Sequence, residues 1–303
     1  MHDAPRTGLT ARDLTAAAAV VVIWGLNFVA MKLGLRSFTP FQLGAARFLF
    51  AMVPLALWVR PPSVPLPWLV TYGLVQGVGQ FASLFFALQV GMTAALASVL
   101  MQTQIFFTAI LGALMLHEGV GRPLKVGMAV AAAGLCCFAI GVATDPGARA
   151  VTAAGLALNL LSAALWAASN IVVRRIQATA GRYDALALVV WSGAVSAPSF
   201  VVLSLAFDDA AARWRWTGTT VGGWLAIAYL GWGSTALAYA LWTSLLQRHP
   251  ASRVAPFSLG VPVVGLLAGV LVLGERVTAW QWAGAALVLS ALGAVIAGSR
   301  LRT

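Results

Sequence analysis

Long apolar blocks separated by short polar connections run along the whole chain of 303 residues. Each block is close to the roughly 20 residues that a helix needs to cross a bilayer. Within a block the hydrophobicity is continuous and does not alternate, which favours helices over the strands of a membrane barrel. The pattern therefore predicts an all-α membrane protein with ten transmembrane helices, at about 14–35, 41–59, 68–89, 94–116, 125–142, 153–173, 184–206, 221–246, 251–273 and 279–298.

The composition agrees with this interpretation, because 61% of the residues are hydrophobic, only 9% are charged and the mean hydropathy is +0.90. A soluble domain carries far more charge. The connections are short and marked by Gly and Pro, as in "RPPSVPLP" (60–67) and "ATDPGARAVT" (143–152). Ten helices use most of the chain, so the sequence predicts no separate soluble domain.

The net charge of +11 is best explained by membrane topology. With the N-terminus in the cytoplasm, twelve Lys and Arg fall on the cytoplasmic side and six outside, and Arg47 inside a block completes the 19. This bias predicts that both termini are cytoplasmic. Anionic membrane lipid is then the partner of the basic groups, and nucleic acid is not a partner, since no basic soluble surface is expected. Cys136 and Cys137 are neighbours on one helix, which favours neither a disulfide nor a metal pair.

The chain repeats itself. Trp24 and Lys32 are eight positions apart in "WGLNFVAMK", and Trp166 and Arg174 have the same spacing in "WAASNIVVR", 142 residues later. Both segments carry a polar amide into an apolar helix. Chance similarity between apolar segments is the alternative explanation for a single match of this kind.

A second match makes the repeat more specific. "TAILGALMLHEGV" (108–120) is similar to "VGLLAGVLVLGERV" (264–277), with Glu118 aligned to Glu275 at an offset of 157. The larger offset fits the long connection at 207–220. The sequence therefore predicts two five-helix halves, 1–150 and 151–303. Because five is odd, the second half enters the membrane from the other side, which makes an inverted repeat.

Three segments carry a family resemblance: "VVIWGLNFVAMKLGL", "GMTAALASVLMQTQIFFTAILGALMLHE" and "SRVAPFSLGVPVVGLLAGVLVLGERVT". They resemble the EamA family of the drug/metabolite transporter superfamily over residues from about 14 to 298. Within the family the chain is similar to bacterial amino-acid exporters of the YddG and EamA type. The resemblance implies ten helices, cytoplasmic termini and a central cavity between the two halves.

Polar and aromatic side chains form stripes at helical spacing in the helices that the resemblance places around this cavity. Polar groups within a span usually face a cavity or a partner helix. Amides are expected to bind ammonium and carboxylate groups, and rings the apolar part of a zwitterion. Interhelical hydrogen bonds are the alternative use of each polar residue. The candidate substrate-binding residues are Trp24, Asn27, Gln76, Gln80, Ser83, Gln102, Trp166, Asn170, Tyr239 and Trp242.

Other residues are expected to shape or close the bundle. Gly25 is expected to help the first helix bend, and Pro256 and Pro262 are in a position to break the ninth. Lys32, Arg36, Arg174 and Arg175 suit the C-terminal ends of their own helices, and a gate or a carboxylate contact is the alternative role.

Arg47 either snorkels to the interface or pairs across the bundle. Glu118 and Glu275 are expected to pair with the nearby Arg122 and Arg276.

The absence of certain groups narrows the function. No acidic residue lies in the middle of a block, so transport is predicted not to depend on a carboxylate in the pocket. The chain contains no H-E-x-x-H, G-x-S-x-G or phosphate-binding G-x-x-x-x-G-K-[ST] motif. We therefore expect no enzyme activity, no catalytic residues, no metal and no cofactor.

The sequence and the resemblance together predict a multi-pass exporter in a bacterial inner membrane. Its substrates are expected to be neutral, aromatic or cysteine/O-acetylserine-like amino acids, moved by alternating access. Export of cationic drugs such as lipophilic dications is an alternative, disfavoured by the missing carboxylate. A sugar-phosphate or nucleotide-sugar carrier is another, but it would need several cations where only Arg47 is available. An intramembrane enzyme and a scaffold or receptor are the alternatives outside transport.

Overall fold

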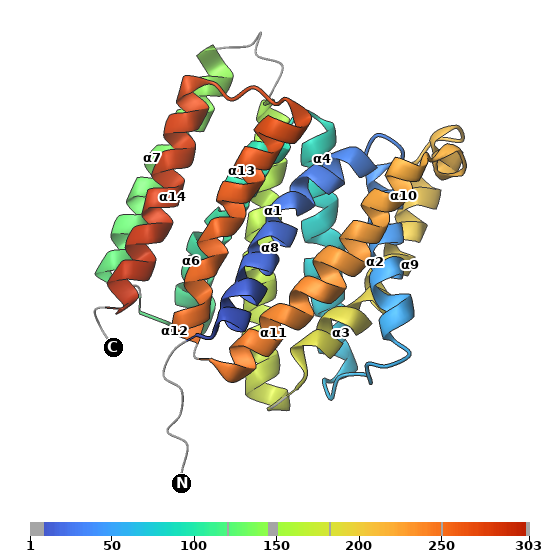
Figure 1. Cartoon of the computed structure of the whole chain (residues 1–303), viewed down its shortest axis with the longest axis horizontal. Coiled ribbons are helices and arrows are strands. Elements are labelled where there is room, and N and C mark those ends of the chain that lie inside the picture. Colours follow the sequence, from blue (N-terminus) through green and yellow to red (C-terminus); the bar gives the residue numbers. More distant parts are fainter. Residues whose placement is uncertain (1–8, 120, 145–150, 182, 250, 301–303) are drawn as a thin grey trace.

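The computed structural model describes residues 9–119, 121–144, 151–181, 183–249 and 251–300, and all regular secondary structure in them is helical (Figure 1). In the first half these elements are α1 (Ala11–Gly34), α2 (Pro40–Leu55), α3 (Leu66–Tyr72), η1 (Gly73–Gln80), α4 (Phe81–Gln89), α5 (Ala94–Leu100), η2 (Met101–Thr103), α6 (Gln104–Leu116) and α7 (Arg122–Thr144). In the second half they are α8 (Ala153–Ala180), α9 (Ala185–Phe207), η3 (Ala212–Gly218), α10 (Val221–Ala228), η4 (Tyr229–Leu237), α11 (Ala238–Arg248), α12 (Ala251–Val254), η5 (Ala255–Leu259), α13 (Gly260–Leu273) and α14 (Ala279–Arg300). Four residues of the charge count, Arg6, Arg149, Arg182 and Arg302, lie outside the described residues.

Eight helical segments of the described chain are long and apolar enough to cross a membrane: Ala11–Gly34, Leu66–Gln89, Ala94–Leu116, Arg122–Thr144, Ala153–Ala180, Ala185–Phe207, Val221–Arg248 and Pro256–Leu273. Two further apolar helices, Pro40–Leu55 and Ala279–Val295, are shorter within the described residues. The prediction of an all-helical membrane protein is confirmed. The total of ten spans stays a prediction.

Local sequence explains where several helices begin and end. Thr10 and Thr39 begin α1 and α2 with capping boxes, in which the threonine hydroxyl accepts from the backbone of the third helical residue. The predicted block 41–59 ends early, at Leu55, because Pro54 lacks an N–H and disturbs the last turn of α2. The predicted block 153–173 instead continues to Ala180. Ile176 in this extension is fully buried, and its burial favours the additional helical turns.

Four of these segments contain irregular turns. Leu66–Gln89 and Val221–Arg248 contain the π-helical turns η1 and η4, Ala94–Leu116 contains the 3₁₀ turn η2, and Pro256–Leu273 begins with the 3₁₀ turn η5. Pro256 lies in η5, between α12 and α13. The predicted helix 251–273 is therefore broken where proline was expected to break it. Pro262 lies in the first turn of α13. Irregular turns inside helices often occur at functional sites, and these four surround one region of the bundle.

Helices of the two halves contact one another throughout the bundle. Helix α1 of the first half packs on α13 and α11 of the second, and α8 of the second half packs on α6 and α4 of the first. Every residue of α5 is buried. The pair α7 and α14 lies at one edge of the molecule (Figure 1). Gly25 lies where α1 crosses α13, and an added Cβ would be 2.5 Å from Val264 Cβ. Its missing side chain therefore permits close packing, whereas the bend expected there is not visible as a break in α1.

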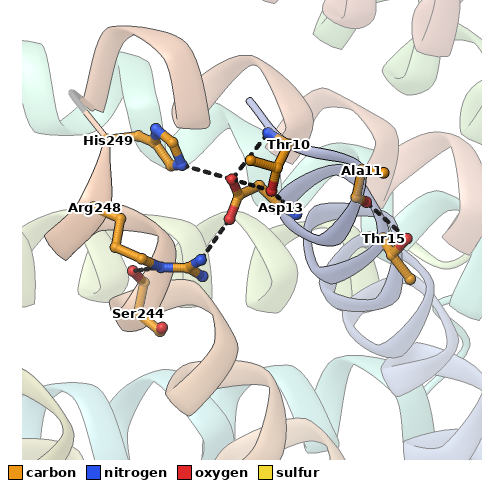
Figure 2. Close-up of polar contacts among 7 residues, drawn as sticks. All are labelled: Thr10, Ala11, Asp13, Thr15, Ser244, Arg248 and His249. Carbon is orange, nitrogen blue, oxygen red and sulfur yellow. Dashed lines mark hydrogen bonds and ion pairs between the residues drawn. The ribbon is translucent and has the colours of Figure 1, made fainter. Parts of the chain in front are cut away.

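The two ends of the bundle can be distinguished. We call the end where α1 begins and α14 ends the proximal end, and the end where α1 stops and α5 begins the distal end (Figure 1). At the proximal end, the buried Asp13 joins α1 to the end of α11 (Figure 2). Its carboxylate lies 2.6 Å from Arg248 Nη1 and 2.9 Å from His249 Nε2. These contacts join the start of α1 to the C-terminal end of α11.

Candidate functional site

A cavity of about 360 Å³ lies in the middle of the bundle, lined by helices of both halves. Nine of the ten candidate residues line it: Trp24, Asn27, Gln76, Gln80, Gln102, Trp166, Asn170, Tyr239 and Trp242. The structure therefore brings together side chains from α1, η1, η2, α8 and α11 that are far apart in the sequence. The volume suits a small molecule.

Ser83 is the exception among the ten. It does not line the cavity, and its hydroxyl donates to the carbonyl of Gly79 in its own helix at 2.8 Å. The prediction that Ser83 lies on the same helix face as Gln76 and Gln80 assumes regular α-helical spacing. The π-helical turn η1 holds more residues in each turn, so residues after it are rotated away from the α-helical register. Ser83 therefore lies outside the lining of this cavity.

Three aromatic rings form one wall. The ring centre of Trp24 is 5.3 Å from that of Tyr239 and 5.4 Å from that of Trp242. The indole N–H of Trp24 donates to the carbonyl of Ser234 at 3.0 Å. Ring pairs at these separations are favourable, and the hydrogen bond fixes the orientation of Trp24. This wall is an apolar surface with the phenol of Tyr239 at its edge.

Arg47 provides a buried positive charge on another wall. It is 4% exposed, and its guanidinium donates to Asn27 Oδ1 at 3.2 Å and Thr235 Oγ1 at 3.4 Å. The guanidinium carbon also lies 4.2 Å from the ring centre of Phe81. Of the two roles left open by the sequence, Arg47 has the one across the bundle, because Thr235 belongs to the second half. It was not among the ten candidates, although a cation inside an apolar block was the signal for it.

Two amide clusters complete the polar lining. In the first, Gln76 Nε2 donates to Gln80 Oε1 at 3.4 Å, and Gln80 Nε2 donates to Ser162 at 3.2 Å. The hydroxyl of Ser169 donates to Gln76 Oε1. These bonds join η1 to α8 and hold the amides at the cavity wall, so packing and lining are both roles of the same residues.

The second amide cluster lies nearer the proximal end. Asn170 Nδ2 donates to Gln104 Oε1 at 3.0 Å and to Thr108 at 3.1 Å. Gln102 also lines the cavity, and its amide has no hydrogen-bond partner among the described residues. The polar lining residues outside the ten candidates are Arg47, Tyr72, Ser98, Gln104, Ser169, Ser234 and Ser258.

A second hollow extends the cavity toward the proximal end. It shares Gln104, Ile105 and Asn170 with the cavity and reaches Glu118 and Arg174. Arg174 Nη1 and Glu118 Oε2 are 2.5 Å apart, and both side chains are more than 40% exposed. The expectation that Glu118 pairs with Arg122 is wrong, because α8 continues past Arg174 and brings this guanidinium to the end of α6.

The distal end has a different set of charged contacts. Glu275 accepts from the backbone N–H groups of Ala94 and Ala95, both at 2.8 Å. The predicted pair with Arg276 is therefore wrong: the free N–H groups at the start of α5 attract the carboxylate instead. Lys32 Nζ donates to the carbonyls of Leu88 and Met92, at 2.6 and 2.8 Å, and so binds the end of α4. Lys32 thus serves the end of a neighbouring helix as well as its own.

No group of three or more His, Cys, Asp or Glu side chains among the described residues has the arrangement of a metal site. Cys136 and Cys137 are free thiols, as expected for neighbours on α7.

Comparison with known proteins identifies the family. The model of the EamA-like transporter family matches the chain twice, at residues 13–140 and 153–297. The chain belongs to the EamA-like transporter family. The family resemblance seen in the sequence is confirmed, and this EamA-like transporter is a multi-pass membrane protein.

Relatives cover nearly the full length of this EamA-like transporter. A protein of Salmonella typhimurium named "Probable amino-acid metabolite efflux pump" is 38% identical over 97% of this chain and 98% of its own. A protein of Escherichia coli with the same name is 37% identical over 97% and 98%. An "Uncharacterized transporter" of Archaeoglobus fulgidus is 28% identical over 92% and 96%. These names are those of transporters.

A protein of known crystal structure has a similar fold, with a TM-score of 0.62 and 17% sequence identity over 97% of this chain and 99% of that one. At this identity the similarity shows the fold alone.

Proposed function

We propose that this EamA-like transporter exports amino acids or close derivatives across a bacterial inner membrane by alternating access. The observation that carries the proposal is the cavity between the two halves, lined by amides, aromatic rings and Arg47. Its size and mixed lining suit a small zwitterion with an apolar side chain. The names of the two relatives from Salmonella and Escherichia coli support the same substrate class.

The polar and the aromatic lining residues are proposed to bind different parts of the substrate. Asn27, Gln76, Gln80, Gln102 and Asn170 supply amide groups for the charged ends of the substrate. The rings of Trp24, Trp166, Tyr239 and Trp242 hold its apolar part.

The alternating-access mechanism rests on an inverted repeat of ten helices, with α2 and α14 as the two shorter spans. Helix contacts between the halves occur in corresponding pairs, such as α1 with α13 and α8 with α6. The N-cap residues Thr10 and Thr152 are 142 positions apart. This is the offset between the segments that begin at Trp24 and Trp166. The two separate matches of the family model also divide the chain near the proposed boundary, between halves 1–150 and 151–303. Such repeats permit one half to rock against the other around a central site.

The described conformation corresponds to one state of this cycle. The hollow that reaches Glu118 and Arg174 connects the cavity to the proximal end. Toward the distal end the side chains of Met31, Leu88 and Met92 are buried, and Lys32 binds the carbonyls of Leu88 and Met92. We infer that the opposite state releases the contacts of Glu275 and closes the proximal end.

Both termini are proposed to face the cytoplasm. In Figure 1 α1 begins and α14 ends at the proximal end, so the two ends of the described chain lie on one side. The excess of Lys and Arg predicted for that side supports its assignment to the cytoplasm. The described conformation would then be open inward, as an exporter must be to load its substrate.

The composition of the lining argues against the two other transported classes. No Asp or Glu lines the cavity among the described residues, and Arg47 would repel a lipophilic dication. A sugar phosphate would leave part of its charge unpaired with a single cation. The same missing carboxylate supports transport that is not coupled to a proton bound in the pocket.

The proposal is tested by uptake into proteoliposomes that hold the purified protein. Labelled threonine, methionine and phenylalanine are compared with a triose phosphate and a lipophilic dication, with and without a pH gradient. Flux of amino acids that is independent of the gradient is expected. Flux that needs the gradient would contradict the argument from the missing carboxylate, and flux of the phosphate or the dication alone would contradict the substrate class.

A further inference from the structure

The cavity wall holds a buried cation that no described carboxylate neutralises. Arg47 is 4% exposed, and its contacts are the amide oxygen of Asn27, the hydroxyl of Thr235 and the ring of Phe81. The ion pairs of the described residues do not include Arg47. Burying a charge in this way is costly unless an opposite charge compensates it. Neutral dipoles and one ring leave most of that charge available to a ligand.

The orientation of Asn27 can be deduced from its neighbours. Its side-chain atom that faces Arg47 accepts from the guanidinium at 3.2 Å and from Ser234 Oγ at 2.8 Å. Because a guanidinium only donates hydrogen bonds, this atom must be Oδ1, and Nδ2 must point elsewhere. Nδ2 has no hydrogen-bond partner among the described residues. Asn27 is therefore an unused donor beside the cation.

Arg47 itself also has an unused donor. Its Nε is buried and makes no hydrogen bond. The N–H group at Nε of Arg47 and the amide N–H groups of Asn27 are thus unpaired, and the two side chains are hydrogen-bonded to each other. Buried donors are normally paired, so the unpaired guanidinium N–H beside an unused amide donor at the cavity wall indicates a place for an acceptor that the ligand brings.

We propose that Arg47 and Asn27 form the carboxylate-binding site of the cavity, and that a free carboxylate is therefore required of every substrate. A planar guanidinium and an amide match the geometry of a carboxylate. The proposal rests on the proposed function, since it assigns one group of the substrate to the same cavity. It gives the carboxylate to Arg47 and Asn27 and leaves the other amides to the remaining polar groups.

A purely structural role is the competing explanation for Arg47, because the side chain joins α2 to α1 and η4. The two explanations differ in a way that needs no mutation. A structural cation does not distinguish an acid from its amide, whereas a carboxylate site does.

The test measures binding to the purified full-length protein of phenylalanine, phenylalaninamide, phenethylamine, N-acetylphenylalanine and 3-phenylpropionate. The three carboxylates are expected to bind about tenfold or more tightly than the matched amide and amine, as a charge-assisted hydrogen bond implies. The Arg47→Gln variant should lose this preference, and Arg47→Lys should retain part of it. Ser83→Ala, which changes a hydroxyl outside the cavity, should keep the full preference.

Equal affinity of the wild-type protein for acid and amide would overturn the proposal, even if Arg47→Gln did not fold. Failure of all three carboxylates to bind would overturn it as well, and so would tighter binding of glycerol 3-phosphate than of any carboxylate. Binding of 3-phenylpropionate without flux of any amino acid would support the carboxylate site while rejecting amino-acid export. Flux of amino acids and their amides at equal rates would reject the site and leave export standing.

Discussion

Glu118 and Glu275 have the same backbone setting in the two halves but hold different partners. Each follows a residue in the left-handed conformation, His117 or Gly274, and each donates its backbone N–H to a glycine carbonyl at 3.2 Å. Glu275 binds the start of α5 with both carboxylate oxygens, whereas the carboxylate of Glu118 lies against Arg174. Corresponding residues therefore close the distal end and border the open proximal end.

The contacts of Glu275 are expected to hold the distal end shut. Glu275→Gln keeps the shape but removes the charge that favours the start of α5, and we expect this to weaken closure by about 1 to 2 kcal/mol. With Cys136 and Cys137 replaced by Ala, a single cysteine at Gln102 should then react faster with an impermeant thiol reagent added at the distal side. The matched variant Glu118→Gln should not increase this rate, and equal rates in both variants would contradict the assignment.

Asp13 is expected to stabilise the proximal end of α1 through two kinds of contact. It accepts from the backbone of Thr10 at 3.0 Å in the capping box and from Arg248 at 2.6 Å. Asp13→Asn should therefore lower the thermal midpoint, with a loss of about 1 to 3 kcal/mol for a buried charged acceptor. Arg248→Gln removes only the ion pair, whose cation is partly exposed, and should cost less than about 1 kcal/mol. A larger effect of Arg248→Gln than of Asp13→Asn would show that the capping box contributes little.

Gly25 is expected to be sensitive to size. Gly25→Val would place a branched side chain against Val264 and the backbone N of Gly265, which an added Cβ would approach to 3.1 Å. Overpacking of this kind costs about 1 to 3 kcal/mol, so the yield of monodisperse protein and its thermal midpoint should fall. Gly293→Val is the matched control on α14, because an added Cβ there has no neighbour within 4 Å. Equal yields for the two variants would mean that α1 and α13 can separate without loss.

Two polar residues of the segment Leu66–Gln89 permit a direct comparison of a lining and a non-lining position. Gln76 lines the cavity and Ser83, seven positions later, does not. Gln76→Ala is expected to raise the apparent KM for amino-acid uptake about tenfold, the effect of losing one or two hydrogen bonds to a charged group. Ser83→Ala should leave KM unchanged. A change in KM for Ser83→Ala alone would mean that η1 is α-helical in the transporting protein.

The membrane helices follow from the sequence alone, because a long apolar block has no stable alternative to a helix in a bilayer. The predicted block 94–116 coincides with the observed segment, and most others agree within a few residues. Polar residues inside such blocks were also informative, since Trp24, Asn27, Gln76 and Asn170 all line the cavity. The cost of exposing an amide to lipid is high enough to predict that it faces inward.

The partners of the charged groups, and the direction in which side chains point after an irregular turn, depend on tertiary packing. Glu118 pairs with Arg174 because α8 extends beyond its apolar block, which hydropathy did not indicate. Ser83 does not share the helix face of Gln76 and Gln80, because the π-helical turn η1 precedes it. Such a turn has no clear pattern in the sequence. Arg47 was visible as an isolated cation, but its partners Asn27 and Thr235 lie on two other helices, and only packing could bring them together.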